Sequence, residues 1–594
     1  MELTITLKHL RKSRMNVVHV THEAAEKIGG IGAVIAGLVN AEPYRRAVSR
    51  TILIGPLLHT NQPPELRLGE GGRIFYSSVD GHEPPEWRKK FSAIERTYDV
   101  GIIYGTRMVH EPCTGEVVEV EVLLIDVFSI NQKRLSLFKG ELWKKFAIPS
   151  DNFESAWEFE QYVRLAEPGY EALSAIGWDD SKKMTAILAH EYMGVPTALQ
   201  AVLDGDRDVR TVFYAHEVAS VRPVLENTPG HDTMFYNVLS QVSAQGKSVE
   251  DVFPSVLANY KHPLVKAARY LDHIFAVGDY VVDELRFVDK HIERKEIDLV
   301  YNGIPAVKIT LDEKVESRER MRQYAENLLG QRPTWVMGHV CRPVVSKAIW
   351  RDLGVLHGLE PMLLERDETA VFFMLGTLAG QRRERDIAEM ERVYGWPVAH
   401  EKGYPDLCGG EEVLGEMFDC FNRDHTAVRA VLVNQWDWSP EFCGRRMPEG
   451  MTFADIRRGT DVEFGLSAYE PFGISQFEAL CFGAICLVSN VCGCMGFARR
   501  SEEGSDCQCV LEGDFLRGGE GWDTESLLSM RTDQRDAVEA EETARLAREL
   551  IEILPRDSET MARQMRVGYD LACRMSWDCV VRDYFLPALV RAAT

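Results

Sequence analysis

The chain has 594 residues, which is too many for one ordinary hydrophobic core and predicts at least two large domains. With 45% hydrophobic and 27% charged residues, its composition is that of a soluble globular protein and excludes a disordered or fibrous one. The formal net charge of -23 would repel a polyanion over long range, so we expect no nucleic acid and no anionic membrane as a main partner.

The beginning of the chain, MELTITLKHLRKSRM, lacks the uninterrupted apolar core of a signal peptide. Elsewhere no apolar run is long enough to span a bilayer. The sequence therefore predicts a cytoplasmic protein without a membrane partner.

Short β-branched runs alternate with longer amphipathic runs, a pattern that is typical of α/β layering. In the first half, strands are predicted at residues 16–20, 51–54, 122–125, 185–188, 212–214, 274–277 and 299–300. In the second half, they are predicted at residues 334–337, 370–375, 428–433, 461–466 and 485–488. This order predicts two Rossmann-like, doubly wound α/β domains that face a cleft.

A charged helical stretch from Leu311 to Arg332 separates the two sets of strands. We place the division there, with an N-terminal domain over residues 1–320 and a C-terminal domain over residues 331–574. An insert at residues 401–424 is rich in glycine and acids, and it predicts either a surface loop or a contact in a homo-oligomer.

A glycine-rich loop follows the first predicted strand and contains Lys27, Gly29 and Gly30. Glycines let the backbone come close to a ligand, and Lys27 adds a mobile cation. The alternative is a tight turn without a ligand.

Two cations, Arg342 and Lys347, follow the first predicted strand of the second half. At a strand end, such a pair can neutralise a diphosphate and stabilise the charge that grows as the diphosphate leaves. Taken singly, each residue is as well explained as a solvated surface cation.

The stretch SAYEPFGISQFEALCFG, residues 467–483, places two acids in an otherwise apolar run. Ser475 and Glu478 have the spacing of a capping box, and Gly483 could end the helix that this box begins. Glu470 precedes that helix and would project into the same space. From the local pattern, Glu478 is as readily a helix cap as a ligand.

The same stretch offers backbone amides at the carboxyl end of a predicted strand, where parallel sheets bind their ligands. The amides of Phe472, Gly473 and Ile474 would lie at a helix N-terminus, which favours a phosphate or a polar sugar edge.

The cysteine pairs Cys492/Cys494 and Cys507/Cys509 have one intervening residue each, whereas zinc pairs usually have two to four. We read the cysteines of these segments as small buried hydrophobic residues and expect no metal site.

Taken together, the three segments resemble those of the retaining glycosyltransferases of the GT-B fold, and are most similar to glycogen and starch synthases. The shared features are Lys-x-Gly-Gly, an Arg with a Lys five residues later, and Glu-Pro-x-Gly with a second Glu eight after the first. Further similar segments follow in unbroken order at residues 189–194 (AHEYMG), 213–216 (FYAH), 301–304 (YNGI) and 575–578 (MSWD).

The resemblance implies a C-terminal helix, residues 575–594, that crosses back onto the first domain. It also implies transfer of a glucosyl unit from UDP-glucose or ADP-glucose to the non-reducing end of an α-1,4-glucan, with retention of the anomeric configuration. No cofactor or metal is implied, because the nucleotide sugar is a co-substrate.

For the second domain, the resemblance implies that Glu478 holds the ribose diol and that Glu470 contacts hydroxyls of the donor sugar. Arg342 and Lys347 would hold the diphosphate, helped by the amides of Gly473 and Ile474.

For the first domain, the resemblance implies that Lys27 and the loop of Gly29 and Gly30 close over the diphosphate. His216 would lie against the donor sugar near its reacting carbon, with His190 as its neighbour.

The sequence also departs from the pattern of the bacterial and plant enzymes, because Ala33 stands where they usually have Asp. The sequence therefore determines neither the nucleotide base of the donor nor the identity of the acceptor. One alternative is another GT-B enzyme with a small, lipid or protein acceptor, or a sugar-nucleotide epimerase of like fold. The other is a carbohydrate-binding or regulatory protein that has lost catalysis. Lys27, Arg342 and Lys347 argue against a protein without catalysis, because such a protein has no need of cations that stabilise a leaving group.

Overall fold

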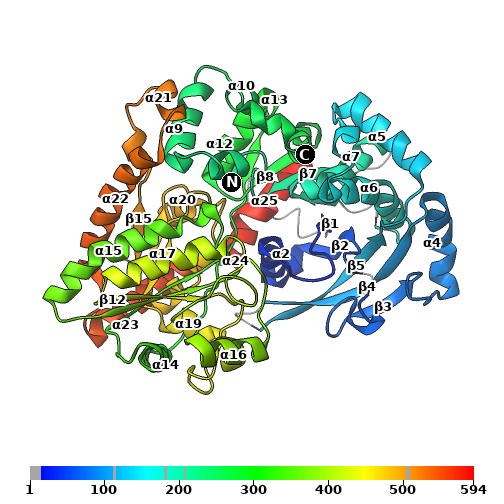
Figure 1. Cartoon of the computed structure of the whole chain (residues 1–594). Coiled ribbons are helices and arrows are strands. Elements are labelled where there is room, and N and C mark those ends of the chain that lie inside the picture. Colours follow the sequence, from blue (N-terminus) through cyan, green and yellow to red (C-terminus); the bar gives the residue numbers. More distant parts are fainter. Residues whose placement is uncertain are drawn as a thin grey trace. The chain divides into compact units, whose positions relative to one another are not determined.

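The computed structural model describes residues 15–59, 61–111, 115–178, 184–205, 209–502 and 509–593. The chain forms two compact units, each with a largely parallel sheet covered by helices (Figure 1). Unit 1 comprises Met1–Val224, Val242–Gly303 and Trp577–Thr594, and unit 2 comprises Leu225–Gln241 and Ile304–Ser576.

Within the described residues, unit 1 has a nine-stranded sheet that is parallel from β5 to β9 and antiparallel at its β3–β4–β5 edge. In sheet order the strands are β3 (Arg73–Ser77), β4 (Gly101–His110), β5 (Val117–Asp126), β2 (Val48–Pro56), β1 (Met15–Val20), β6 (Thr185–His190), β7 (Val209–Ala215), β8 (His273–Ala276) and β9 (Ile297–Leu299). Every strand predicted in the first half overlaps one of these, whereas β3 and β4 were not predicted.

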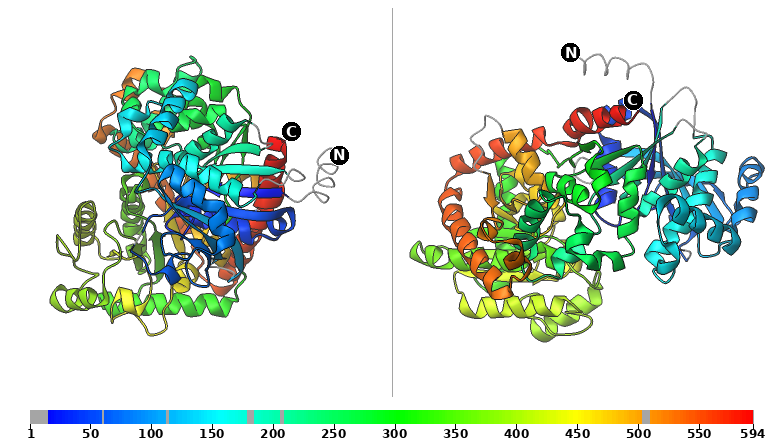
Figure 2. Two further views of the ribbon diagram at one scale, coloured as in Figure 1. Left: turned by 90° about the vertical axis from the view of Figure 1, so that its right-hand side faces the viewer. Right: turned by 90° about the horizontal axis from the view of Figure 1, so that it is seen from above.

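The C-terminal segment belongs to unit 1, as the sequence predicted. It consists of α24 (Trp577–Val580), a π-helical turn at Val581–Phe585, and α25 (Leu586–Ala593), which packs against β7 (Figure 1). In both views of Figure 2, this red helix lies beside the blue N-terminal strand. Trp577 packs closely on two glycines: a Cβ on Gly37 would lie 2.0 Å from its ring, and a Cβ on Gly303 would lie 2.6 Å from it.

Within the described residues, unit 2 has a six-stranded, entirely parallel sheet. In sheet order the strands are β12 (Val428–Val433), β11 (Ala370–Leu375), β10 (Trp335–Val340), β13 (Val462–Gly465), β14 (Ile485–Ser489) and β15 (Val510–Gly513). All but β15 were predicted. Successive residues of β11 alternate between two hydrophobic clusters, Phe372 in one and Phe373 in the other, so helices cover both faces of a doubly wound sheet.

The insert at residues 401–424 is more than a surface loop. Its second part forms helix α17 (Glu411–Asp424), which places Leu414, Phe418 and Phe421 in the core of unit 2. These residues recur at the three- and four-residue spacing of one helix face, so their burial follows from the sequence.

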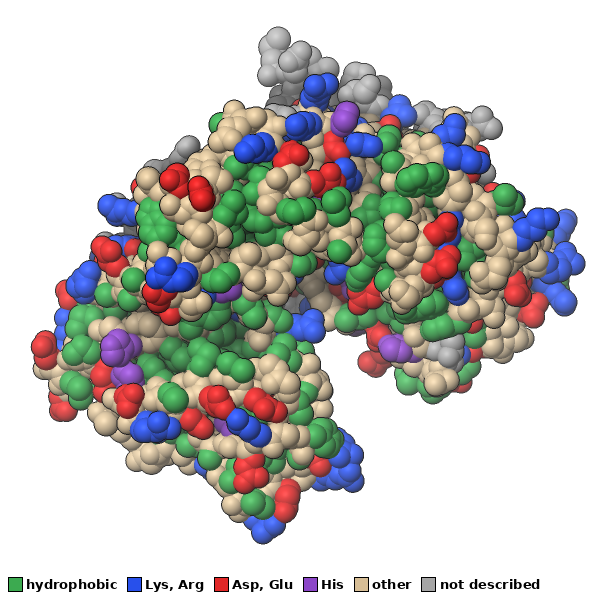
Figure 3. Space-filling model, turned by 45° about the horizontal axis from the view of Figure 1, so that its top comes forward, with side chains coloured by type: hydrophobic (Ala, Val, Ile, Leu, Met, Phe, Trp, Pro, Cys, Tyr) green, Lys and Arg blue, Asp and Glu red, His purple; other side chains and the backbone are tan. Residues whose placement is uncertain are grey.

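Acidic and basic side chains are mixed over most of the face that Figure 3 shows. None of the helices in the described ranges combines the length and the apolar character needed to cross a membrane.

Candidate functional site

Each unit carries predicted site residues at the carboxyl ends of its parallel strands. The unit 2 site comprises the loops after β10 and β13, residues 341–348 and 466–478. The unit 1 site comprises residues 21–30 after β1, residues 190–191 at the end of β6, and residues 216–217 after β7. Parallel sheets bind ligands at this edge.

In the unit 2 site, the structure brings Lys347 and Glu470 together as an ion pair. The backbone carbonyl of Ser346 accepts hydrogen bonds from the amides of Ala468 (2.8 Å) and Tyr469 (3.1 Å), which joins the two loops. The paired side chains are only 16% and 15% exposed. Because partial burial reduces screening by water, this pair is more favourable than an ordinary surface pair.

The Glu470 loop depends on a glycine and a glutamine. Gly473 has a φ of +92°, and a Cβ there would lie 2.5 Å from Gln476 Oε1 and 2.9 Å from Glu470 Cγ. The Gln476 side chain donates to Glu470 Oε2 at 3.2 Å. The amide of Cys494 donates to the carbonyl of Phe472 at 2.8 Å. Glu470 is therefore oriented by contacts on both sides of the turn.

The predicted capping box is wrong. Residues 475–483 form two short 3-10 turns, Ser475–Phe477 and Leu480–Phe482, and the first has no side-chain cap. Gly483, with a φ of +79°, ends the second turn as expected. Glu478 instead pairs with Arg457 of helix α19 (Phe453–Gly459), because a charged guanidinium attracts the carboxylate more strongly than the neutral backbone amide of a capping box does.

Arg457 also bonds Glu463 of β13, with Nη1 2.8 Å from Oε1. Burial raises the pKa of Glu463 to about 7, although Arg457 acts in the opposite direction. Arg457 thus joins a buried carboxyl group to the partly exposed Glu478. The sequence showed Arg457 only as half of a basic pair with Arg458, since its partners are set by the tertiary structure.

The two remaining predicted cations are exposed. Among the described residues, no ion pair or side-chain hydrogen bond is found for Arg342 in unit 2 or for Lys27 in unit 1. Both groups are therefore accessible to an anionic ligand.

In the unit 1 site, Glu23 shapes the glycine-rich loop. Its carboxylate accepts from the amides of Ile28 and Gly29, both at 2.6 Å. Gly30, which begins helix α2 (Gly30–Asn40), faces open space. A Cβ on Gly32 would lie 2.4 Å from Glu23 Oε2, so this conformation of the loop requires glycine at position 32. From the sequence, Glu23 was assigned no role.

Two predicted histidines lie side by side in unit 1. His190 Nδ1 is 2.8 Å from His216 Nε2, and their rings are stacked with centroids 5.0 Å apart. Behind them, His19 Nδ1 is 2.8 Å from His190 Nε2. Burial holds the pKa of His19 and His216 at about 3, so these rings are neutral. His19 was read only as part of a strand.

Glu191 begins helix α7 (Glu191–Asp204) with a φ of +59°, a strained conformation for a residue with a side chain. Its Oε1 accepts from the amide of Glu217 at 2.6 Å, and its buried Oε2 has no partner within the described part of the chain. Burial raises the pKa of Glu191 well above its usual value, and the nearby Glu217 adds to this. Burial therefore favours the neutral form of this carboxyl group.

Within the described ranges, no group of three or more His, Cys, Asp or Glu residues is arranged to hold a metal ion. Cys492 and Cys494 are buried, and Cys507 lies outside the described residues.

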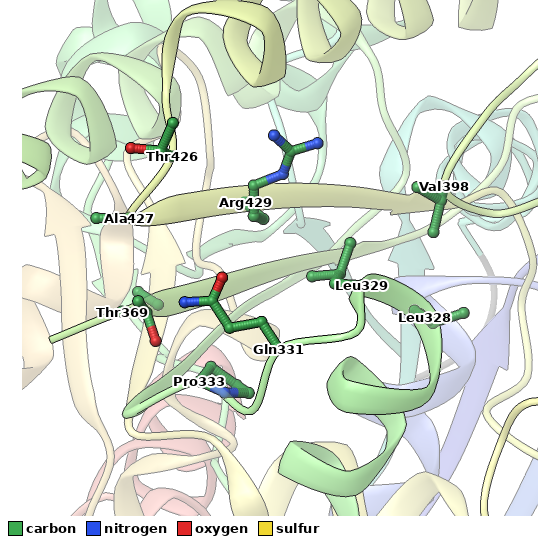
Figure 4. A pocket seen from close by; sticks show the side chains of 10 residues that line it. Leu328, Leu329, Gln331, Pro333, Thr369, Val398, Thr426, Ala427 and Arg429 are labelled. Atoms are coloured by element: carbon green, nitrogen blue, oxygen red, sulfur yellow. The ribbon is translucent and has the colours of Figure 1, made fainter.

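A pocket of about 330 Å³ lies at the amino ends of the strands of unit 2, opposite the ends that carry the site (Figure 4). Its lining includes Pro333, Thr369 and Ala427, which precede β10, β11 and β12. Since the predicted site residues follow the strands, this pocket is separate from the unit 2 site.

The fold and the two sites define the class: a protein of two doubly wound α/β units, each with polar and charged loops at the carboxyl ends of parallel strands, and a C-terminal helix that returns to unit 1.

No protein-family model matches the sequence, and no curated protein matches it significantly. Solved structures are similar over nearly the whole length of both chains. The catalytic domain of starch synthase IV from Arabidopsis thaliana, bound to ADP and acarbose, has a TM-score of 0.48 and 13% identity, covering 98% of this chain and 100% of that one. A trehalose-6-phosphate protein from E. coli, bound with UDP-2-fluoro glucose, has a TM-score of 0.49 and 11% identity, covering 96% and 98%.

Proposed function

We propose that the chain is a retaining glycosyltransferase of the GT-B type. In this proposal it moves a glucosyl unit from a nucleoside diphosphate glucose to the non-reducing end of an α-1,4-glucan. The observation that carries the proposal is the ion pair of Lys347 and Glu470. The Lys347 cation can bind a diphosphate, and the Glu470 carboxylate can accept hydrogen bonds from sugar hydroxyls. The pair therefore offers both kinds of group that one sugar nucleotide needs.

The donor's phosphates are assigned to the cations of the unit 2 site. Arg342 is exposed, and its planar guanidinium suits bidentate binding of a phosphate. Lys347 would then exchange part of its contact with Glu470 for a phosphate oxygen. The amides of Gly473 and Ile474 add neutral donors.

The donor's hydroxyl groups are assigned to two carboxylates. Glu470 would accept from the transferred sugar, and Glu478 would accept from both hydroxyls of the ribose. Arg457 pairs with Glu478, which orients that carboxylate.

In the transfer step, the bond between the anomeric carbon and the diphosphate oxygen breaks, and a bond to the acceptor oxygen forms on the same face. The acceptor proton passes to the leaving phosphate. Lys347 and Arg342 stabilise the negative charge that grows on the diphosphate.

Unit 1 would serve the same reaction through Lys27 and the loop of Gly29 and Gly30, which suit a phosphate. His216, with His190 behind it, would contact the sugar. The two histidines are neutral, so they suit hydrogen bonds with hydroxyl groups and not attraction to an anion.

The test offers UDP-glucose and ADP-glucose with glycogen, with maltooligosaccharides, with glucose 6-phosphate as a small acceptor, and with no acceptor. Diphosphate release and chain growth are measured. Growth of the glucan supports the proposal. Release that depends on the small acceptor, without chain growth, would favour a different transferase. A protein that folds but releases no diphosphate under any condition would contradict transferase activity with these donors.

A matched pair of variants tests the assignment within unit 2. Lys347→Ala should abolish most of the diphosphate release. Lys402→Ala, which breaks an exposed Lys–Glu pair with Glu416 in the same unit, should leave it unchanged.

A further inference from the structure

Three histidines of unit 1 share one face of the sheet at its carboxyl edge, and we call them the histidine row: His19 on β1, His190 on β6 and His216 after β7. His19 is in register with Leu188, and His190 is in register with Tyr214. Side chains alternate along a strand, so the three imidazoles must point to the same side.

The row forms one continuous hydrogen-bonded chain that extends to two hydroxyl groups. His216 Nε2 is 2.8 Å from His190 Nδ1, and His190 Nε2 is 2.8 Å from His19 Nδ1. His19 Nε2 is 3.0 Å from the hydroxyl of Tyr44 in helix α3 (Glu42–Ala47). The Tyr44 hydroxyl is in turn 3.1 Å from the hydroxyl of Thr51 on β2. At the other end, the buried His216 Nδ1 has no partner among the described residues.

Each ring of the row carries a single proton. His19 and His190 are fully buried, and burial lowers the pKa of all three imidazoles far below the physiological range. A neutral imidazole donates at one nitrogen and accepts at the other. Because every ring bonds its neighbour, the three tautomers are coupled, and only two arrangements of the chain satisfy all of its hydrogen bonds.

In the first arrangement, donation runs from Thr51 through Tyr44 to His216, whose Nδ1–H then has no acceptor. In the second, donation runs from His216 to Thr51, and only a lone pair on His216 Nδ1 is left without a partner. The half-buried Thr51 hydroxyl can donate its own hydrogen bond to water. Since a buried donor without an acceptor is rarer in proteins than an under-used acceptor, the second arrangement is preferred.

We propose that Tyr44 and His19 are positioning residues that fix His216 as its Nε2–H tautomer, so that His216 Nδ1 offers a lone pair to a hydroxyl group of the ligand. The identification of that hydroxyl as one of a sugar rests on the proposed function. The chain of hydrogen bonds itself does not, because it lies within unit 1 and needs no ligand.

The experiment compares two Tyr→Phe variants of the full chain labelled with 15N-histidine. NMR of the ring nitrogens distinguishes the two neutral tautomers, and His216→Gln identifies the signals of His216. Tyr44→Phe removes the acceptor of His19 Nε2–H. Tyr214→Phe is the control: its ring is closer to His216, with centroids 4.5 Å apart, but its hydroxyl has no hydrogen-bond partner within the described residues.

In the wild type and in Tyr214→Phe, His216 should be almost entirely the Nε2–H tautomer. In Tyr44→Phe, either direction of the chain leaves one buried N–H without an acceptor, so His216 should become a mixture of both tautomers. If Tyr44→Phe does not fold, Thr51→Val serves instead, because it removes the last acceptor and should produce the same mixture. An Nδ1–H tautomer in the wild type, or an unchanged His216 in both folded variants, would overturn the proposal.

An activity measurement separates this inference from the proposed function. With transfer established, Tyr44→Phe should lower kcat by about tenfold, the scale of one lost hydrogen bond, with a smaller change in KM for the donor. If the wild type transfers no sugar but Tyr44→Phe shows the expected tautomer change, the proposed function alone is contradicted. Active protein in which Tyr44→Phe leaves the His216 tautomer unchanged would contradict the coupling alone.

Discussion

The ammonium group of Lys347 donates a hydrogen bond to the carboxylate of Glu470, which lies 123 residues further along the chain. Two loops that follow neighbouring parallel strands, β10 and β13, bring the residues together. In the absence of a ligand, this contact keeps both charges partly desolvated and oriented. A bound diphosphate sugar would find its cation and its hydroxyl acceptor already in place.

The first prediction concerns Glu470. Under the proposed function, Glu470→Ala should lower the rate of transfer by roughly a hundredfold or more, since it would remove the acceptor for the sugar and free Lys347 to adopt other orientations. Unit 2 should stay folded. The control is Glu416→Ala, which breaks an exposed Lys–Glu pair in the same unit and should leave the rate unchanged. A near-normal rate for Glu470→Ala would show that this carboxylate does not take part in the reaction.

The second prediction concerns Glu478. Under the proposed function, Glu478→Ala should raise KM for the nucleotide sugar by about tenfold or more with a smaller effect on kcat, because the proposed ribose contact would contribute mainly to donor binding. Glu478 caps no helix, so the melting temperature should change little, and Arg457 keeps Glu463 as its partner. Steady-state kinetics and thermal melting measure both effects. Unchanged KM together with a large loss of stability would assign Glu478 a structural role.

The arrangement of strands was largely accessible from the sequence, because strands buried on both faces are continuous β-branched and apolar runs. Strands β6 and β11 are examples, with every residue buried. The antiparallel strand β4 was missed, because its apolar run at residues 102–104 is only three residues long and lies between Gly101 and Gly105.

The side-chain partners were less accessible. Ser475 and Glu478 have the spacing of a capping box, yet Glu478 pairs with Arg457, which a local pattern does not include. His19 and His190 lie on separate strands and His216 follows a third, and only the register of the sheet shows that they form one chain. Residue types at strand ends can therefore predict a site, but the contacts that orient them depend on the tertiary structure.

The third prediction concerns pH and the buried Glu463. Burial raises its pKa from 4.5 to about 7 in the folded protein. Between these values the folded state holds a proton that the unfolded state has released, so this group's contribution to stability is full below pH 4.5 and is lost as the pH rises towards 7. Glu463→Gln removes this dependence. Its free energy of unfolding relative to wild type should therefore increase over that pH range.

Chemical denaturation of the full chain at several pH values measures this difference. The comparison uses the difference between variant and wild type at each pH, so titrations shared by both proteins cancel. A difference that stays constant or decreases with pH would contradict a raised pKa for Glu463.

The fourth prediction concerns Gly473. Gly473→Ala places a Cβ 2.5 Å from Gln476 Oε1 and 2.9 Å from Glu470 Cγ, so the side chains that orient Glu470 must move. Gly403→Ala is the matched control, because Gly403 has a similar φ of +95° but faces open space. Both variants should lose about 1–2 kcal/mol of stability from the left-handed backbone, whereas only Gly473→Ala should also lose most of its transfer activity. Equal activity in the two variants at matched folded concentration would mean that the exact position of Glu470 is not needed for the reaction.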